Sequence, residues 1–447
     1  MTAEGRKLAE GRKTAAGRVA YINARLLDPA TGLDERGALL TDGPLIADLG
    51  PGLFRDGVPE GITTIDCGGH CLAPGLVDMR VQLREPGEEH KETIETASRA
   101  AAAGGITAMV CLPNTEPLID DVAVLEFVAR RAREVRLVKV FAYGTVTKGL
   151  KGEDLTEMGL LAEAGALGFT DGIKAVANAR VMLRALSYAR GFNKVIIQHP
   201  EEPRLAEGGV MNAGEIAMRL GLSGVPAAAE TIMVERDLQL VELSGGRYHA
   251  AHLSTAAAIE RVRRAKAAGL PVTCDTAPPY FALNETAVGD YRTFAKLSPP
   301  LRSESDRRAV VEGLKDGTID VIASDHAPHD QDSKRLPFAQ AEFGIVGLET
   351  LLPIALELYH NRHLPLLQVL RAMTTRPAEL LGLPLGRITV GAAADLVLFD
   401  LDRPGRIEID QFRSKSKNSP FDERPVEGRV LRTIVDGRTV FTLGGEA

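Results

Sequence analysis

From Cys71 to about residue 325, short apolar runs alternate with amphipathic segments, and this alternation constrains the fold more than any other feature. The apolar runs have the length of buried strands, and the segments between them have the periodicity of helices that bury one face. The predicted strands cover residues 72–83, 106–113, 137–146, 167–171, 194–199, 247–253, 271–277 and 319–325. The predicted helices cover residues 90–103, 119–135, 179–190, 226–242, 254–268 and 304–315, with two more near 346–360 and 366–374. This pattern predicts an α/β fold, a (β/α)8 barrel, rather than a doubly wound sheet.

The two ends of the chain have a different pattern. Residues 19–66 and the chain after Leu381 contain short apolar runs separated by Gly, Pro and Asp, which is typical of small antiparallel strands. Residues 1–17 contain the near-repeat EGRKLAEGRKTAAGR, which has no apolar face to bury. We therefore predict a disordered tail there, with a basic contact to a partner as the alternative.

Composition and charge exclude several classes of protein. The net charge of −7 disfavours a nucleic-acid binder, because phosphate binding calls for a positive field. No apolar run approaches the roughly 20 residues that span a bilayer, and the N-terminus has no hydrophobic signal core. We therefore expect a cytoplasmic protein that contacts neither nucleic acid nor membrane. The four cysteines are scattered in apolar segments, so we expect buried, reduced thiols.

Polar residues that suit a catalytic or metal site stand where the predicted barrel strands end. The carboxyl ends of barrel strands meet at one mouth, where active sites are built. The first two strands supply Arg80, Gln82, Arg84 and Asn114, and later strands supply Asp171, His199, His252, Asp325, His326 and His329. A single histidine in such a place is more often a core residue, but several of them predict a site.

The segment PGLVDMRVQLREPG, residues 74–87, resembles the first barrel strand of the amidohydrolase superfamily, and in particular of the class I dihydroorotases. VMNAGEIAMRLGLSGVPAAAE, SPPLRSESDR, DGTIDVIASDHAPH, FGIVGLE and SKSKNSPF resemble the same branch, so the resemblance runs from about Gly17 to Phe441. It implies a barrel of residues 71–384 and a composite β-domain in which residues 18–70 pack with residues 385–443. It also implies a zinc site and a cyclic amide substrate.

In that family two cations lie at the barrel mouth, and the resemblance implies which residues would hold them. One cation uses a histidine pair on the first strand, a carboxylate after the fourth and an aspartate after the eighth. The other uses the bridging carboxylate and the histidines of the fifth and sixth strands. Arg80 and Gln82 replace the histidine pair here, and Gly172 replaces the second residue of the family's Asp doublet, which leaves the bridging residue open. The matching ligands are Asp171, His199, His252 and Asp325.

Arg80 changes the chemistry of this site on physical grounds alone. A guanidinium stays protonated and has no lone pair for a metal. At about 4 Å from a divalent cation it would repel that ion by several kcal/mol at an effective dielectric of about 20. We expect Arg80 to form charge-assisted hydrogen bonds with Asp171 and Asp325 and to take the place of the first cation. The remaining partial site would hold one zinc ion or none, and with zinc bound Asp325 would be the general base.

The resemblance also implies that Arg84, Asn114 and His329 hold the substrate carboxylate, and an arginine suits that planar group. The alternative explanation of Arg84 and Asn114 is turn chemistry. The family's Asn-Pro-Pro-Leu-Arg begins with Ser298 here, and its Thr-Pro-His-His is Ala277-Pro278-Pro279-Tyr280. The contacts to the substrate ring are therefore altered.

Three functions are consistent with these residues. The first is a pseudoenzyme of pyrimidine biosynthesis, a catalytically impaired dihydroorotase homologue that acts as a structural partner of aspartate carbamoyltransferase. The second is an active dihydroorotase that interconverts N-carbamoyl-aspartate and dihydroorotate with one zinc ion. The third is a related cyclic amidohydrolase for a hydantoin-like or allantoin-like ring. The combined changes on the first strand and in the substrate loop favour the first, and we also expect a homo-oligomer.

Overall fold

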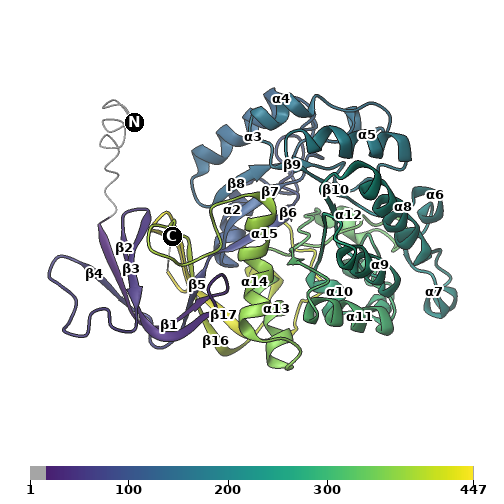
Figure 1. Ribbon diagram of the computed structural model, residues 1–447. Coiled ribbons are helices and arrows are strands. Elements are labelled where there is room, and N and C mark those ends of the chain that lie inside the picture. The colour runs from purple at the N-terminus through teal and green to yellow at the C-terminus, as the bar shows by residue number, and fades with distance from the viewer. Residues whose placement is uncertain (1–16, 446–447) are drawn as a thin grey trace.

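In the computed structural model, which describes residues 17–445, a barrel of parallel strands stands beside a mixed sheet (Figure 1). Residues 1–16 of the predicted tail lie outside the described residues. Within residues 17–445, no helix combines the length and the apolar character needed to cross a membrane.

The barrel consists of two parallel sheets that join at their edges. The three-stranded sheet contains β6 (Leu76–Val81), β7 (Ile106–Cys111) and β8 (Lys139–Ala142). The five-stranded sheet contains β9 (Gly168–Phe169), β10 (Val195–Gln198), β13 (Tyr248–Ala250), β14 (Val272–Thr276) and β15 (Val321–Ile322). Single parallel bridges close the ring, one between Gly144 and Phe169 and one between Val81 and His326. The predicted (β/α)8 barrel is confirmed.

Helices follow most of the barrel strands and surround them (Figure 1). They are α2 (Ile94–Ala103), α3 (Val122–Val135), α4 (Met158–Glu163), α5 (Ala179–Arg190), α6 (Pro203–Ala206), α7 (Glu215–Leu220), α8 (Ala228–Ser244), α9 (Ala256–Ala267), α10 (Pro278–Ala282), α11 (Glu304–Lys315), α12 (Gln331–Arg335), α13 (Leu351–His360), α14 (Leu366–Met373) and α15 (Thr375–Leu381). The helices α2, α3, α5, α9 and α11 begin at side chains that accept a hydrogen bond from the first turn, which satisfies backbone donors that have no partner within the helix. These caps are Thr93, Asp121, Asn178, Thr255 and Ser303. Short 3₁₀ turns lie at Lys148–Leu150, Glu285–Val288, Thr293–Ala295 and Ile409–Gln411.

The mixed sheet combines strands from both ends of the chain. Its strands are β1 (Arg18–Asp28), β2 (Leu33–Asp42), β3 (Leu45–Gly50), β4 (Thr63–Asp66), β5 (Cys71–Pro74), β16 (Leu396–Arg406), β17 (Pro425–Val435) and β18 (Arg438–Thr442). The two halves meet at β5, which pairs with β1 on one side and β16 on the other. The sheet thus extends to Pro74, four residues beyond the segment 18–70 that the resemblance implies. β11 (Met211–Asn212) and β12 (Gly224–Val225) form a separate parallel pair.

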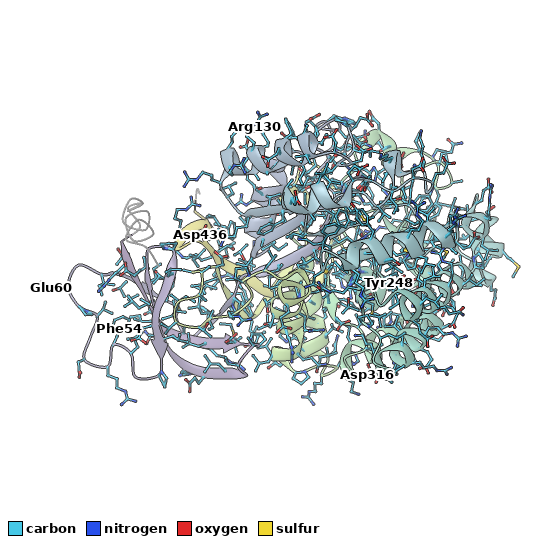
Figure 2. The ribbon with its side chains drawn as sticks, turned by 45° about the horizontal axis from the view of Figure 1, so that its top comes forward. Phe54, Glu60, Arg130, Tyr248, Asp316 and Asp436 are labelled. Atoms are coloured by element: carbon cyan, nitrogen blue, oxygen red, sulfur yellow. The ribbon has the colours of Figure 1, made fainter. Side chains whose placement is uncertain are left out.

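The main core lies between the barrel and its helices, and a second apolar cluster fills the barrel itself. Tyr248, labelled in the barrel region of Figure 2, belongs to the main core and donates a hydrogen bond from its hydroxyl to Asp237 of α8 at 2.9 Å. The second cluster includes Leu380 and Leu381 of α15 together with barrel residues such as Val110. The four cysteines are free and buried, as predicted.

Gly75 divides the predicted strand 72–83 between the two sheets. β5 ends in the mixed sheet at Pro74, and β6 begins in the barrel at Leu76. A Cβ atom on Gly75 would lie 2.2 Å from the Thr107 side chain of β7, so only glycine lets the chain pass this close. The junction of the two sheets therefore depends on a residue without a side chain.

We predict that Gly75→Ala destabilises the protein, because overpacking of this kind typically costs about 1–3 kcal/mol. The check is a thermal melt, in which the variant should unfold at a lower temperature than the wild type. Gly52→Ala is a matched control, since its Cβ would meet nothing closer than 3.7 Å. Equal midpoints for all three proteins would contradict the close approach at Gly75.

Candidate functional site

A cavity of about 560 Å³ opens at the carboxyl ends of the barrel strands. It is lined by eight residues singled out in the sequence, namely Arg80, Gln82, Arg84, Asn114, His199, His252, Asp325 and His329. A larger groove of about 1010 Å³ lies between α3, β8 and the mixed sheet, but its lining contains none of the predicted site residues. The chemistry of the chain is therefore concentrated at the mouth.

The centre of the mouth is an ion pair between the first and the last barrel strands. Arg80 donates a hydrogen bond from Nε to Oδ1 of Asp325 at 2.7 Å and one from Nη2 to the carbonyl of Gly172 at 3.2 Å. The Arg80 side chain is 2% exposed and the Asp325 side chain 12%. Burial alone would raise the pKa of Asp325, but the His252 and Arg80 side chains together hold that pKa below its ordinary value. Asp325 is thus an ionised carboxylate with one oxygen bound to a guanidinium.

Two histidines continue from Asp325 across the mouth. Nδ1 of His252 lies 3.2 Å from Oδ2 of Asp325, and Nε2 of His252 lies 2.7 Å from Nδ1 of His199. Nε2 of His199 faces Oε1 of Glu201 at 3.7 Å. Burial and then the charge of Arg80 lower the pKa of His252 to about 4, so this imidazole is neutral at pH 7. The two imidazoles contact each other directly.

Asp171 does not join this group. Its Oδ1 accepts hydrogen bonds from the backbone N–H groups of Val146 and Thr147, both at 2.9 Å, and its Oδ2 accepts one from the Thr147 hydroxyl at 2.5 Å. Burial raises the pKa of Asp171, and these hydrogen bonds act in the opposite direction. The expected bond from Arg80 to Asp325 is present, whereas the one to Asp171 is replaced by the bond to the Gly172 carbonyl.

The opposite wall carries the residues expected to hold a carboxylate. Arg84 donates to the carbonyl of Pro328 at 3.1 Å and pairs with Glu88 at 2.7 Å. Nε2 of His329 lies 2.8 Å from the carbonyl of Phe343, which calls for a hydrogen on Nε2, and 3.2 Å from Nη2 of Arg84, which calls for a lone pair there. Nδ1 has no hydrogen-bond partner within residues 17–445.

Asn114 completes this wall. Its amide nitrogen donates to Oε1 of Gln82 at 3.0 Å, which fixes the orientation of both side chains. Oδ1 of Asn114 is buried and has no partner among the described residues. The wall therefore contains two buried polar atoms without a partner among the described residues, Oδ1 of Asn114 and Nδ1 of His329.

Three residues of the mouth have a backbone conformation that side chains disfavour. The φ angles are +62° at Arg84, +39° at His252 and +52° at Asp325. A residue other than glycine in this region costs roughly 1 kcal/mol or more, and such residues cluster at functional sites. The strain is consistent with a site whose side-chain positions are imposed by the surrounding structure.

The residues of the mouth do not fit the two-cation site that the resemblance implies. Arg80 and Gln82 stand in place of two ligands, and the Asp171 oxygens are already bonded. Nowhere in residues 17–445 are three or more His, Cys, Asp or Glu side chains placed together to hold a metal ion. Nδ1 of His199 and Nε2 of His252 lie 2.7 Å apart and share a hydrogen bond, so they could supply two of the four ligands that zinc usually takes only after that hydrogen bond is broken.

Other residues that position the site were not assigned a role from the sequence. Asn418 accepts a hydrogen bond from the His329 backbone at 3.1 Å and donates to the carbonyls of Ala327 and Gly344. Asp275 accepts a hydrogen bond from the His252 backbone N–H at 2.5 Å. Asn418 could have been found from the sequence, because it lies in the SKSKNSPF segment that resembles the family. Nothing in the local sequence distinguishes Asp275.

His329 gives the site a predicted pH dependence. Burial and the nearby charge of Arg84 lower the pKa of His329 to about 2, so the folded protein keeps it neutral at pH 5. An unfolded histidine takes up a proton near pH 6.5, so stability is lost as the pH falls below that value, by at most about 1.4 kcal/mol per pH unit. His329→Gln should therefore lose less of its thermal midpoint between pH 7 and pH 5 than the wild type. His363→Gln, at an exposed position, should keep the wild-type loss, and equal losses in all three proteins would contradict the prediction.

Comparison with known proteins identifies the family that the sequence motifs resemble. A model of the dihydro-orotase-like family matches residues 69–258, and a model of the amidohydrolase family matches residues 295–441. The chain is 52% identical over 429 residues to a dihydroorotase of Anaplasma phagocytophilum, covering 95% of each chain. It is 47% identical to a dihydroorotase of Geobacter sp. strain M21, covering 94% of this chain and 98% of that one.

Solved structures show the same architecture. The L-hydantoinase of Arthrobacter aurescens superposes with a TM-score of 0.85 at 28% identity, covering 96% of this chain and 97% of that one. A dihydropyrimidinase of Brevibacillus agri, at 22% identity and a TM-score of 0.82, shares the fold. With relatives of about half identical sequence along nearly its whole length, this chain belongs to the dihydroorotase family of the amidohydrolases.

Proposed function

We propose that this dihydroorotase-family protein binds dihydroorotate or N-carbamoyl-aspartate at the barrel mouth and hydrolyses or closes the ring far more slowly than a metal-loaded relative. The observation that carries the proposal is the ion pair of Arg80 and Asp325, with its 2.7 Å hydrogen bond. Asp325 is the residue that the resemblance implies as general base. A carboxylate bound to a guanidinium, with a pKa below its ordinary value, is a poor base at neutral pH.

The opposite wall supports the binding half of the proposal. Arg84, Asn114 and His329 line the same cavity, and Oδ1 of Asn114 is a buried acceptor without a partner among the described residues, which suits a ligand N–H group rather than a carboxylate. Arg84 is already paired with Glu88, whose side chain is 29% exposed. A ligand carboxylate would share or replace Glu88 on the guanidinium, which forms paired hydrogen bonds with planar carboxylates.

A second candidate is an active dihydroorotase, or a related cyclic amide hydrolase, with one metal ion. Two observations favour it. The curated relatives at 46–52% identity are named dihydroorotase, and these names support an active enzyme more than an impaired one. His199 and His252 also lie side by side, and their Nδ1 and Nε2 atoms would be available to a metal ion once the 2.7 Å hydrogen bond between them is broken. Zinc at such nitrogens would polarise a carbonyl and activate water, once solvent or a substrate completed its ligands.

Elemental analysis and a dihydroorotate hydrolysis assay distinguish these candidates. We predict well under one metal ion per chain in protein purified without chelators, and turnover at least about 1000-fold below that of the Anaplasma phagocytophilum relative assayed in parallel. About one zinc per chain with ready turnover would contradict the proposal and establish the second candidate. In that case Asp325→Asn should abolish turnover.

The converse experiment restores the missing ligands. Arg80→His with Gln82→His and Gly172→Asp removes the guanidinium from the mouth and returns the family's residues at three positions. We predict that this triple variant binds zinc, measured by elemental analysis after dialysis, while the single variant Gln82→His does not. Zinc contents equal to that of the wild type would show that the remaining ligands are no longer placed to bind metal.

We further propose that the chain serves as a structural partner of aspartate carbamoyltransferase. A mouth held together by an internal ion pair supports this, because such a barrel would keep its form without metal. Size-exclusion chromatography of the two proteins after chelator treatment should give a joint peak, with each protein alone as the control. Failure to co-elute under any buffer condition would remove this role and leave the ligand-binding proposal intact.

A further inference from the structure

Arg80 has one donor that the protein does not use. Its Nε and Nη2 are bonded to Asp325 and Gly172, but Nη1 is buried and has no hydrogen-bond partner in residues 17–445. A buried polar group left without a partner costs about 1–3 kcal/mol, and more when it is charged. Arg80 lines the cavity although Nη1 itself is covered, so an oxygen of a ligand in that cavity would become the acceptor for Nη1 after a small movement of the side chains around it.

The cavity therefore has two guanidinium groups on its wall. Arg84 lies four residues after Arg80 and lines the same cavity, and its side chain is 7% exposed. Lys91 and Lys174 also add positive charge to the cavity, and Glu88, Glu116, Asp325 and Glu342 add negative charge, while Oδ1 of Asn114 is an unpartnered acceptor. Two guanidinium groups match two carboxylates, and the amide oxygen matches a ureido N–H.

N-carbamoyl-aspartate and dihydroorotate, the two ligands of the proposed function, differ in their number of carboxylates. N-carbamoyl-aspartate has a ureido group and two carboxylates. Closing the ring joins the ureido NH₂ to one carboxylate with uptake of a proton and loss of water, so dihydroorotate has one carboxylate and an imide carbonyl in place of the other. Hydrogen bonds to a charged acceptor are roughly twice as strong as those between neutral groups. A guanidinium at the reacting end thus favours the open form.

We propose that Arg80 makes this pocket select the acyclic ureido dicarboxylate over its cyclic, singly charged counterpart. The inference rests on the proposed function and goes beyond it. A histidine pair with bound metal would polarise the amide carbonyl of the ring, whereas Arg80 binds the carboxylate that ring closure consumes. Asp325, the partner of Arg80, holds the guanidinium in place for this contact.

Isothermal titration calorimetry of chelator-treated protein tests the proposal with three ligands. N-carbamoyl-L-aspartate should bind at least about 10-fold more tightly than L-dihydroorotate. N-carbamoyl-L-alanine is acyclic but has a single carboxylate, so it separates the effect of charge from that of the ring. It should bind as weakly as dihydroorotate.

Variants at Arg80 then assign the preference to this side chain. Arg80→Met should reduce the ratio of the two affinities to within about 2-fold, by weakening binding of the dicarboxylate alone. Since Arg80→Met leaves Asp325 without its partner, Arg80→Met with Asp325→Asn serves as the second variant, and a thermal melt verifies that each is folded. Arg133→Met, on α3 and away from the cavity, should bind as the wild type does.

The outcomes separate this inference from the function on which it rests. The inference is overturned if folded wild-type protein binds dihydroorotate as tightly as the dicarboxylate. It is also overturned if both Arg80 variants keep the wild-type affinity ratio. In either case the proposed binding of ligands at the barrel mouth still stands. If folded wild-type protein binds none of the three ligands, the proposed function fails as well. Two results together would support both the proposed function and this inference. Arg84→Gln should lose binding of all three ligands, and the affinity ratio of the wild type should fall in the Arg80 variants.

Discussion

The ion pair between Arg80 and Asp325 is the interaction on which the barrel mouth depends. It crosses the seam where the first and the last strands meet, and a single bridge between Val81 and His326 joins the backbones there. The backbone N–H of Gln82 donates a hydrogen bond to the His326 carbonyl across the same seam, at 2.9 Å. Removing one partner of a buried ion pair typically costs about 3–5 kcal/mol, because the other charge is left uncompensated. Each of the two charges therefore depends on its partner at this seam, where a single bridge joins the backbones.

The wall opposite the ion pair is positioned by a segment distant in sequence. The loop around residues 413–421 returns from the mixed sheet to the barrel mouth, where Asn418 bonds the backbone of His329 and of Gly344. Ser414 and the backbone N–H of Lys415 bond the buried carboxylate of Glu92, which precedes α2. The mixed sheet therefore contributes to the site indirectly, by fixing the segments that line the cavity.

The fold was largely predictable from the sequence, and the site only in part. Buried strands such as β10 and amphipathic helices such as α5 follow from periodicity, so all eight barrel strands fall within predicted ranges. The break at Gly75 was missed, because it depends on the approach of Thr107 from another strand. The direction of Asp171 was not predictable either, since the backbone donors of the loop that contains Thr147 compete for its carboxylate. Such competition is decided by three-dimensional packing, which leaves no periodic signal.

The left-handed backbone at Arg84, His252 and Asp325 has a consequence for how this barrel can change. Glycine would adopt these φ angles with little strain, so each of the three positions is one where loss of the side chain would relieve backbone strain. At Asp325 this relief would be outweighed by the loss of the ion pair with Arg80, because the buried guanidinium would be left without a partner. The folded chain keeps an arginine, a histidine and an aspartate at these strained positions, and all three face one cavity. The strain energy sets a lower limit on the free energy that each side chain contributes through its own contacts.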